Sequence, residues 1–70
     1  MVTIYTQDGC APCQMVKRYF DHFGKQYEMK RRDEFSEEML KIAGTVSTPV
    51  VTDGSSVVVG YNPKELSELL

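Results

Sequence analysis

Residues 2–13 read VTIYTQDGCAPC, and this stretch decides the fold. Its first five residues are rich in β-branched side chains and predict a strand over Val2–Thr6. Residues 7–9 end the strand, and an amphipathic helix is expected to follow them directly. This order places the only two cysteines of the chain, Cys10 and Cys13, at the start of that helix.

The first helix is predicted to end before Gly24, because a helix is often followed by a glycine that adopts a left-handed conformation. Its apolar face is made by residues with helical spacing: Met15, Val16, Tyr19, Phe20 and Phe23. A second, shorter strand is predicted over residues 26–30. A second helix is predicted over residues 36–43, capped by Ser36 and ended by Gly44. Its apolar stripe consists of Phe35, Met39, Ile42 and Ala43.

The last third of the chain predicts a hairpin and a short helix. Strands over residues 49–52 and Val57–Val59 are joined by Asp-Gly-Ser-Ser, a turn signal. Asn62 then provides a helix cap, followed by Pro63 at the first helical position. Leu66, Leu69 and Leu70 form the apolar face of this final helix.

The predicted order is therefore β-α-β-α-β-β-α in one α/β domain over residues 1–70. The first βαβ unit is expected to be a right-handed crossover with parallel strands. The last two strands are expected to be antiparallel. The result is a mixed four-stranded sheet flanked by helices.

The composition excludes several classes of protein. The chain of 70 residues is 41% hydrophobic and 26% charged with a net charge of −2, so the basic stripe of a nucleic-acid-binding protein is not expected. The basic run at residues 30–32 is followed at once by Asp33 and Glu34. It is interpreted as a solvated strand end, with a docking patch for an acidic partner as the alternative. No apolar run approaches the ~20 residues of a membrane span.

The N-terminus lacks the pattern of a signal peptide, so a cytoplasmic protein is expected. In that reducing compartment, a lone pair of cysteines is usually catalytic, redox-sensing or metal-binding rather than a static cross-link.

The motif Cys10-Ala11-Pro12-Cys13 predicts thiol–disulfide exchange, because two cysteines so placed can form a disulfide without refolding of the domain. The helix N-terminus favours a thiolate at Cys10 and is expected to lower its pKa from ~8.5 toward the ~3.5–7.5 of such sites. Cys10, at the loop end, is the predicted attacking thiol, and Cys13, inside the first turn, is the resolving one. Pro12 fixes the first turn, where its missing N–H costs nothing.

A metal site is the alternative interpretation of this motif. Structural zinc needs four ligands, whereas the chain offers the two cysteines and His22. Redox chemistry is therefore favoured, and no metal ligand is assigned.

Thr48-Pro49 is the second informative site. A proline at a strand position is explained by an edge location or a cis peptide bond. Since only about 5–6% of X–Pro bonds are cis, the residues alone favour a trans proline at a strand start.

Four segments together resemble the glutaredoxin family of the thioredoxin superfamily: Ile4-Tyr5-Thr6, Cys10-x-x-Cys13, Thr48-Pro49-Val50-Val51 and Gly60-Tyr61-Asn62-Pro63. The last looks closest to the NrdH-redoxin branch, whose members donate electrons to ribonucleotide reductase. The resemblance implies a thioredoxin fold, with Cys10 attacking and Cys13 resolving. It also implies a cis Pro49 facing the cysteines, and a Thr48 backbone that pairs with an extended partner segment.

Substrate binding is thereby assigned to Pro12, Thr48, Pro49, Gly60 and Tyr61. The chain departs from the family where glutathione would bind. Gln7 replaces the usual cation three residues before the first cysteine, and Tyr61-Asn62-Pro63 replaces an acidic pair. Both departures favour reduction by thioredoxin reductase with NADPH over reduction by glutathione.

The leading hypothesis is a monomeric dithiol electron donor without a bound cofactor that reduces disulfides in a protein, with ribonucleotide reductase as the suggested partner. The alternatives are a glutathione-dependent, deglutathionylating glutaredoxin and a non-enzymatic [2Fe–2S] or metal carrier.

Five further residues are candidates for the site. Asp8, Lys17 and His22 are interpreted as solvated surface residues. Asp8 has a second interpretation, in which it raises the thiol pKa or shuttles a proton, and Lys17 has one in which it favours the thiolate. Tyr5 is interpreted as core, and Tyr61 as a flank of the cysteine cleft.

Overall fold

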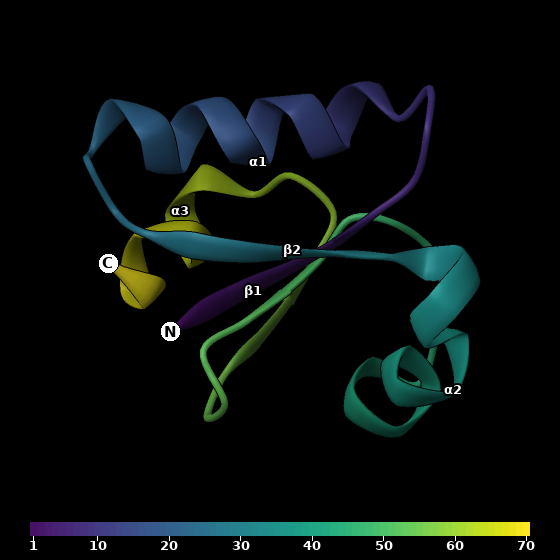
Figure 1. Cartoon of the computed structure of the whole chain (residues 1–70). Coiled ribbons are helices and arrows are strands. Elements are labelled where there is room, and N and C mark those ends of the chain that lie inside the picture. Colours follow the sequence, from purple (N-terminus) through teal and green to yellow (C-terminus); the bar gives the residue numbers. More distant parts are fainter.

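The computed structural model describes all 70 residues. The elements follow the predicted order (Figure 1): β1 (Val2–Thr6), α1 (Ala11–His22), β2 (Tyr27–Arg31), α2 (Arg32–Ala43), β3 (Val50–Thr52), β4 (Val57–Val59), α3 (Pro63–Leu66) and a closing 3₁₀ turn, Ser67–Leu69. None of the helices is long and apolar enough to cross a membrane.

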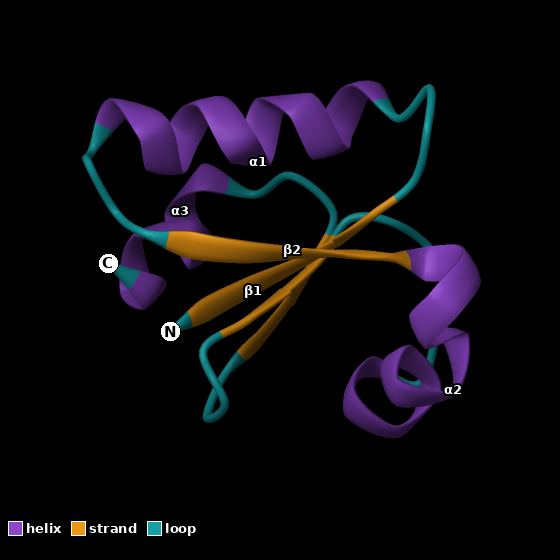
Figure 2. Ribbon diagram, viewed as in Figure 1, coloured by secondary structure: helices purple, strands orange, loops and turns teal.

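The sheet has the strand order β2-β1-β3-β4 (Figure 2). β1 and β2 are parallel, and the pairs β1–β3 and β3–β4 are antiparallel, as predicted. The last residue of β1, Thr6, pairs with the last residue of β2, Arg31. The carboxyl ends of these two strands therefore lie side by side, where the chain turns into α1.

Helices cover both faces of the sheet. Alternate strand residues face opposite sides, so Ile4 and Val51 belong to one core cluster and Tyr5 and Val50 to another. The first cluster is closed by residues of α1, α3 and the closing turn: Val16, Phe20, Leu66 and Leu69. The second is closed by Met39 of α2. Figure 1 shows α1 and α3 on the side of the sheet opposite α2.

The second helix starts earlier than predicted. It begins at Arg32, contains a break at Phe35 (φ −126°, ψ 25°), and its cap residue Arg31 makes no side-chain capping bond. Ser36 therefore follows the break and does not cap the helix. The half-buried Phe35 side chain packs against the cluster of Tyr5 and Met39, and this contact lies at the broken turn.

Four apolar residues predicted as core are exposed: Met15, Phe23, Ile42 and Leu70. In a domain this small each helix is covered along a narrow line only, and the buried residues of α1 are Cys13, Val16 and Phe20. By contrast, the predicted cap of α3 is confirmed, because the Asn62 side chain accepts the Glu65 N–H.

Candidate active site

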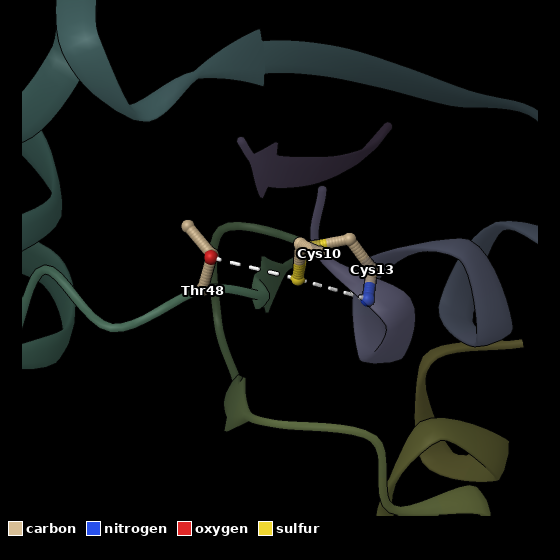
Figure 3. Close-up of a disulfide and its surroundings, with 3 residues drawn as sticks. All are labelled: Cys10, Cys13 and Thr48. Atoms are coloured by element: carbon tan, nitrogen blue, oxygen red, sulfur yellow. Dashed lines mark hydrogen bonds between the residues drawn. A yellow bond between two sulfur atoms is a disulfide. The ribbon is translucent and has the colours of Figure 1, made fainter. Parts of the chain in front are cut away.

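Cys10 and Cys13 form a disulfide at the start of α1, with their Cα atoms 5.3 Å apart (Figure 3). Cys10 is the cap residue of the helix and has extended backbone, which follows from its position directly after the turn at Gly9. Cys13 lies inside the first turn. Cys10 is 9% exposed and Cys13 1% exposed, so the predicted order of accessibility is observed.

Two donors point at the sulfur of Cys10. The Cys13 backbone N–H donates to Sγ at 3.2 Å, and the Thr48 hydroxyl donates to it at 3.6 Å (Figure 3). Both groups would stabilise negative charge on that sulfur after reduction, together with the partial positive charge of the helix N-terminus. Cys13 Sγ receives no such bond, so the two sulfurs are chemically distinct.

The Thr48–Pro49 peptide bond is cis. The trans expectation drawn from the residues alone is therefore wrong, and the expectation drawn from the family resemblance is confirmed. Pro49 is fully buried and precedes β3 rather than opening it. Its carbonyl oxygen accepts the Gly60 N–H at 2.8 Å, which ties the segment after β4 to the segment beside the cysteines.

The Thr48 backbone is free to pair with another chain. Eight backbone–backbone hydrogen bonds lie outside the helices and strands, and Thr48 takes part in none of them. Its side chain meanwhile contacts Cys10. An extended segment that paired with Thr48 would therefore lie beside the Cys10 sulfur.

The remaining residues predicted to bind substrate differ in how closely the structure links them to the cysteines. Gly60 is linked to Pro49, and its φ of 83° is one that glycine adopts easily. Pro12 is exposed in the first turn of α1. Tyr61 is partly exposed and makes no hydrogen bond. Substrate contact by Pro12 and Tyr61 stays a prediction.

Sequence reasoning missed an ion pair beside the motif. Arg31 donates to both carboxylate oxygens of Asp8, at 3.3 and 3.0 Å, and lies 3.5 Å from Asp33. The interpretation of Asp8 as a solvated turn residue is incomplete, because its exposed carboxylate has a fixed cation. No local pattern of the sequence predicts this pair, because it depends on the parallel register that places Arg31 beside Thr6.

A depression of about 310 Å³ lies at this ion pair. Gln7, Gln14 and Met29 line it together with Asp8 and Arg31. Gln7 thus stands beside the cysteine loop with an uncharged side chain, and the one cation of the depression is engaged by carboxylates.

Tyr5 and Lys30 are parts of the fold rather than of the site. The buried Tyr5 hydroxyl donates to Glu38, which also accepts a hydrogen bond from Lys30 at 3.0 Å. Burial, and then the bond to Glu38, raise the pKa of Tyr5 to about 12. The same two hydrogen bonds lower the pKa of Glu38.

The ligands that the zinc alternative requires are dispersed. His22 is the last residue of α1, so it lies roughly 14 Å along the helix from Cys13. No three His, Cys, Asp or Glu side chains are grouped so that they could hold a metal ion.

Comparisons with known proteins point to one family. The family model described as Glutaredoxin matches residues 2–57. The chain is 34% identical over 73 residues to the Gene 56 protein of Mycobacterium phage D29, covering 99% of this chain and 81% of that protein. It is 33% identical over 70 residues to the glutaredoxin-like protein NrdH of Escherichia coli K12, covering 97% and 86%. The solved structure of NrdH-redoxin from Escherichia coli superposes with a TM-score of 0.85 at 32% identity, over 99% of this chain and 93% of that one.

Proposed function

This chain belongs to the glutaredoxin family, in its NrdH/glutaredoxin-like branch, and we propose that it reduces protein disulfides with the dithiol of Cys10 and Cys13. The observation that carries the proposal is the asymmetry of the pair. Cys10 is the more accessible sulfur and receives both hydrogen bonds, from the Cys13 N–H and the Thr48 hydroxyl.

The reaction proceeds in two exchanges. The Cys10 thiolate attacks one sulfur of the partner's disulfide, which forms a mixed disulfide and releases the partner's other sulfur as a thiolate. Cys13, after losing its proton, attacks Cys10 Sγ, and the partner's second thiolate leaves. The partner gains two electrons and takes up two protons, while the Cys10–Cys13 disulfide forms.

Docking of the partner is assigned to Thr48. Its unpaired backbone N–H and C=O accept a short extended segment of the partner as an added strand. The Gly60 N–H bond to the Pro49 carbonyl ties the chain at Thr48 to the segment after β4, and the Thr48 hydroxyl contacts the Cys10 sulfur. Gly60 carries no side chain that would obstruct the partner, and Pro12 and Tyr61 complete the proposed contact surface.

Thioredoxin reductase with NADPH is the proposed source of electrons, with no cofactor bound to the domain itself. Gln7 provides no positive charge for a glutathione carboxylate, and the neighbouring Arg31 is engaged by Asp8. Ribonucleotide reductase is the proposed substrate, because relatives of the chain are NrdH proteins. The proposal includes a monomer acting in the cytoplasm.

The experiment compares two reducing systems. The domain is given insulin or oxidised ribonucleotide reductase, with either NADPH and thioredoxin reductase or NADPH, glutathione and glutathione reductase. NADPH consumption is expected with the first system and little with the second. Turnover with the glutathione system only would contradict thioredoxin reductase as the source of electrons. Turnover that survives Cys10→Ser would contradict the mechanism.

Cys13→Ser serves as the matched variant. It keeps the backbone N–H that donates to Cys10 but removes the resolving thiol. The mixed disulfide with the partner is therefore expected to accumulate and to be visible by mass spectrometry. A Cys13→Ser protein that turns over at the normal rate would contradict the assigned roles.

A further inference from the structure

The Asp8–Arg31 ion pair joins the sheet to the loop that carries the attacking cysteine. Asp8 precedes Cys10 by two residues, so their Cα atoms are at most about 7 Å apart. Arg31 ends β2 opposite Thr6 and reaches forward to hold both oxygens of the Asp8 carboxylate. A guanidinium that binds both oxygens of a carboxylate holds it in one orientation and favours its ionised form. The charges of the pair can therefore act on Cys10 electrostatically.

We propose that this ion pair sets the fraction of Cys10 that is present as thiolate, by cancelling the charge of a carboxylate that stands two residues before the attacking cysteine. An uncompensated carboxylate two residues from Cys10 disfavours the thiolate by repulsion between like charges. Arg31 compensates this repulsion and draws Asp8 toward β2. Both are positioning residues, and the proposal rests on the proposed function only in taking Cys10 as the attacking thiol.

Other charged groups around Cys10 are few. Lys17 follows on α1 and makes no ion pair. Asp33, at the start of α2, lies 3.5 Å from Arg31 and competes with Asp8 for it. The segment that supplies Thr48, together with β3 (residues 45–52), contains no charged residue. Asp8 and its cation are therefore the charged pair closest in sequence to the sulfur.

The test measures the pH midpoint of Cys10 alkylation by iodoacetamide in the reduced protein. All variants carry Cys13→Ser, so that Cys10 is the one reacting thiol. Arg31→Gln is expected to raise the midpoint by about half a pH unit, and Asp8→Asn is expected to lower it by a similar amount. The double variant is expected to return close to the parent, and Arg31→Lys to keep the parent's midpoint.

Two controls separate the charge effect from general loosening of the loop. Arg18→Gln removes a positive charge roughly 12 Å further along the helix, and should leave the midpoint unchanged. The shifts should shrink in 1 M salt, where the Debye length is about 3 Å. The side chains of Arg31 and Asp8 are 50% and 85% exposed, so the variants should remain folded.

Shifts of the same sign in Arg31→Gln and Asp8→Asn would overturn the proposal, as would an unchanged midpoint in Arg31→Gln. Alkylation requires no partner and no reductase. A protein that fails to reduce disulfides yet shows opposite shifts would refute the proposed function alone. Normal turnover with no shifts would refute the ion-pair proposal alone.

Discussion

Thr48 donates the one side-chain hydrogen bond to the Cys10 sulfur, from 38 positions away in the sequence. Replacing Thr48 with Val keeps the β-branched shape and removes the donor. The pH midpoint of Cys10 alkylation is then expected to rise by about half a unit, because a hydrogen bond to the charged form is lost. Thr48→Ser retains a hydroxyl and should stay near the parent. Equal midpoints in the Val and Ser variants would contradict a role for this bond.

Tyr5 makes the stability of the protein depend on pH at the alkaline end. Burial and the hydrogen bond to Glu38 raise its pKa to about 12, whereas a tyrosine in an unfolded chain ionises near pH ~10. The folded state thus holds a proton that the unfolded state releases. This contribution is fully present below pH ~10 and is lost as the pH rises toward 12.

Tyr5→Phe is therefore expected to reduce the fall in unfolding free energy between pH 9 and pH 11. At pH 7 it should cost about 1 kcal/mol, since Glu38 loses a donor. Urea unfolding at the three pH values tests both expectations. Tyr61→Phe is the control, because the Tyr61 hydroxyl makes no hydrogen bond. An unaltered pH dependence in Tyr5→Phe would contradict the assignment.

At the scale of residues, the sequence predicted what depends on local order. Cys10 and Cys13 differ because one precedes the helix and the other lies in its first turn, and both positions follow from chain order. The Asp8–Arg31 pair depends on the register between two strands, which no local pattern specifies. The cis bond at Pro49 likewise required the family resemblance, because the base rate favours trans.

The short helix α3 depends on its cap. Asn62 accepts the Glu65 N–H at 3.3 Å, and its amide nitrogen donates to the Glu65 carboxylate at 3.2 Å. Asn62→Ala is expected to lower the unfolding free energy by about 1 kcal/mol, because the first turn loses its side-chain acceptor. Asn62→Ser keeps an acceptor and should lose less. Urea denaturation of both variants measures the difference, and equal losses would argue against capping.

At the scale of elements, α1 and α3 were predicted more closely than α2. The bounds of α1 and α3 are marked by local signals, Cys10 and Gly24 for one and Asn62 with Pro63 for the other. The break of α2 at Phe35 has no such signal. Its aromatic side chain packs into a cluster formed by distant residues, and tertiary contact of this kind overrides helix propensity.

The whole molecule has two core clusters separated by the sheet. Val16 of α1 belongs to the larger cluster, and Val50 of β3 belongs to the smaller one beneath α2. Neighbouring residues of β3, Val50 and Val51, face opposite clusters, as Tyr5 and Ile4 of β1 do, so the two central strands take part in both. The protein should therefore unfold in a single transition, although its core is divided.

Val16→Ala and Val50→Ala test this architecture together. Each removes buried methyl groups and should lower the unfolding free energy by about 1.5 kcal/mol. Because the two sites lie on opposite faces of the sheet and share no cluster, the double variant should lose the sum to within about 0.5 kcal/mol. Urea midpoints should fall with an unchanged slope in all three variants. Two separate transitions would show that the clusters unfold independently, and the sheet would then not couple them. A single transition with additive losses would mean that the strands transmit stability from α2 to the helix that carries the cysteines.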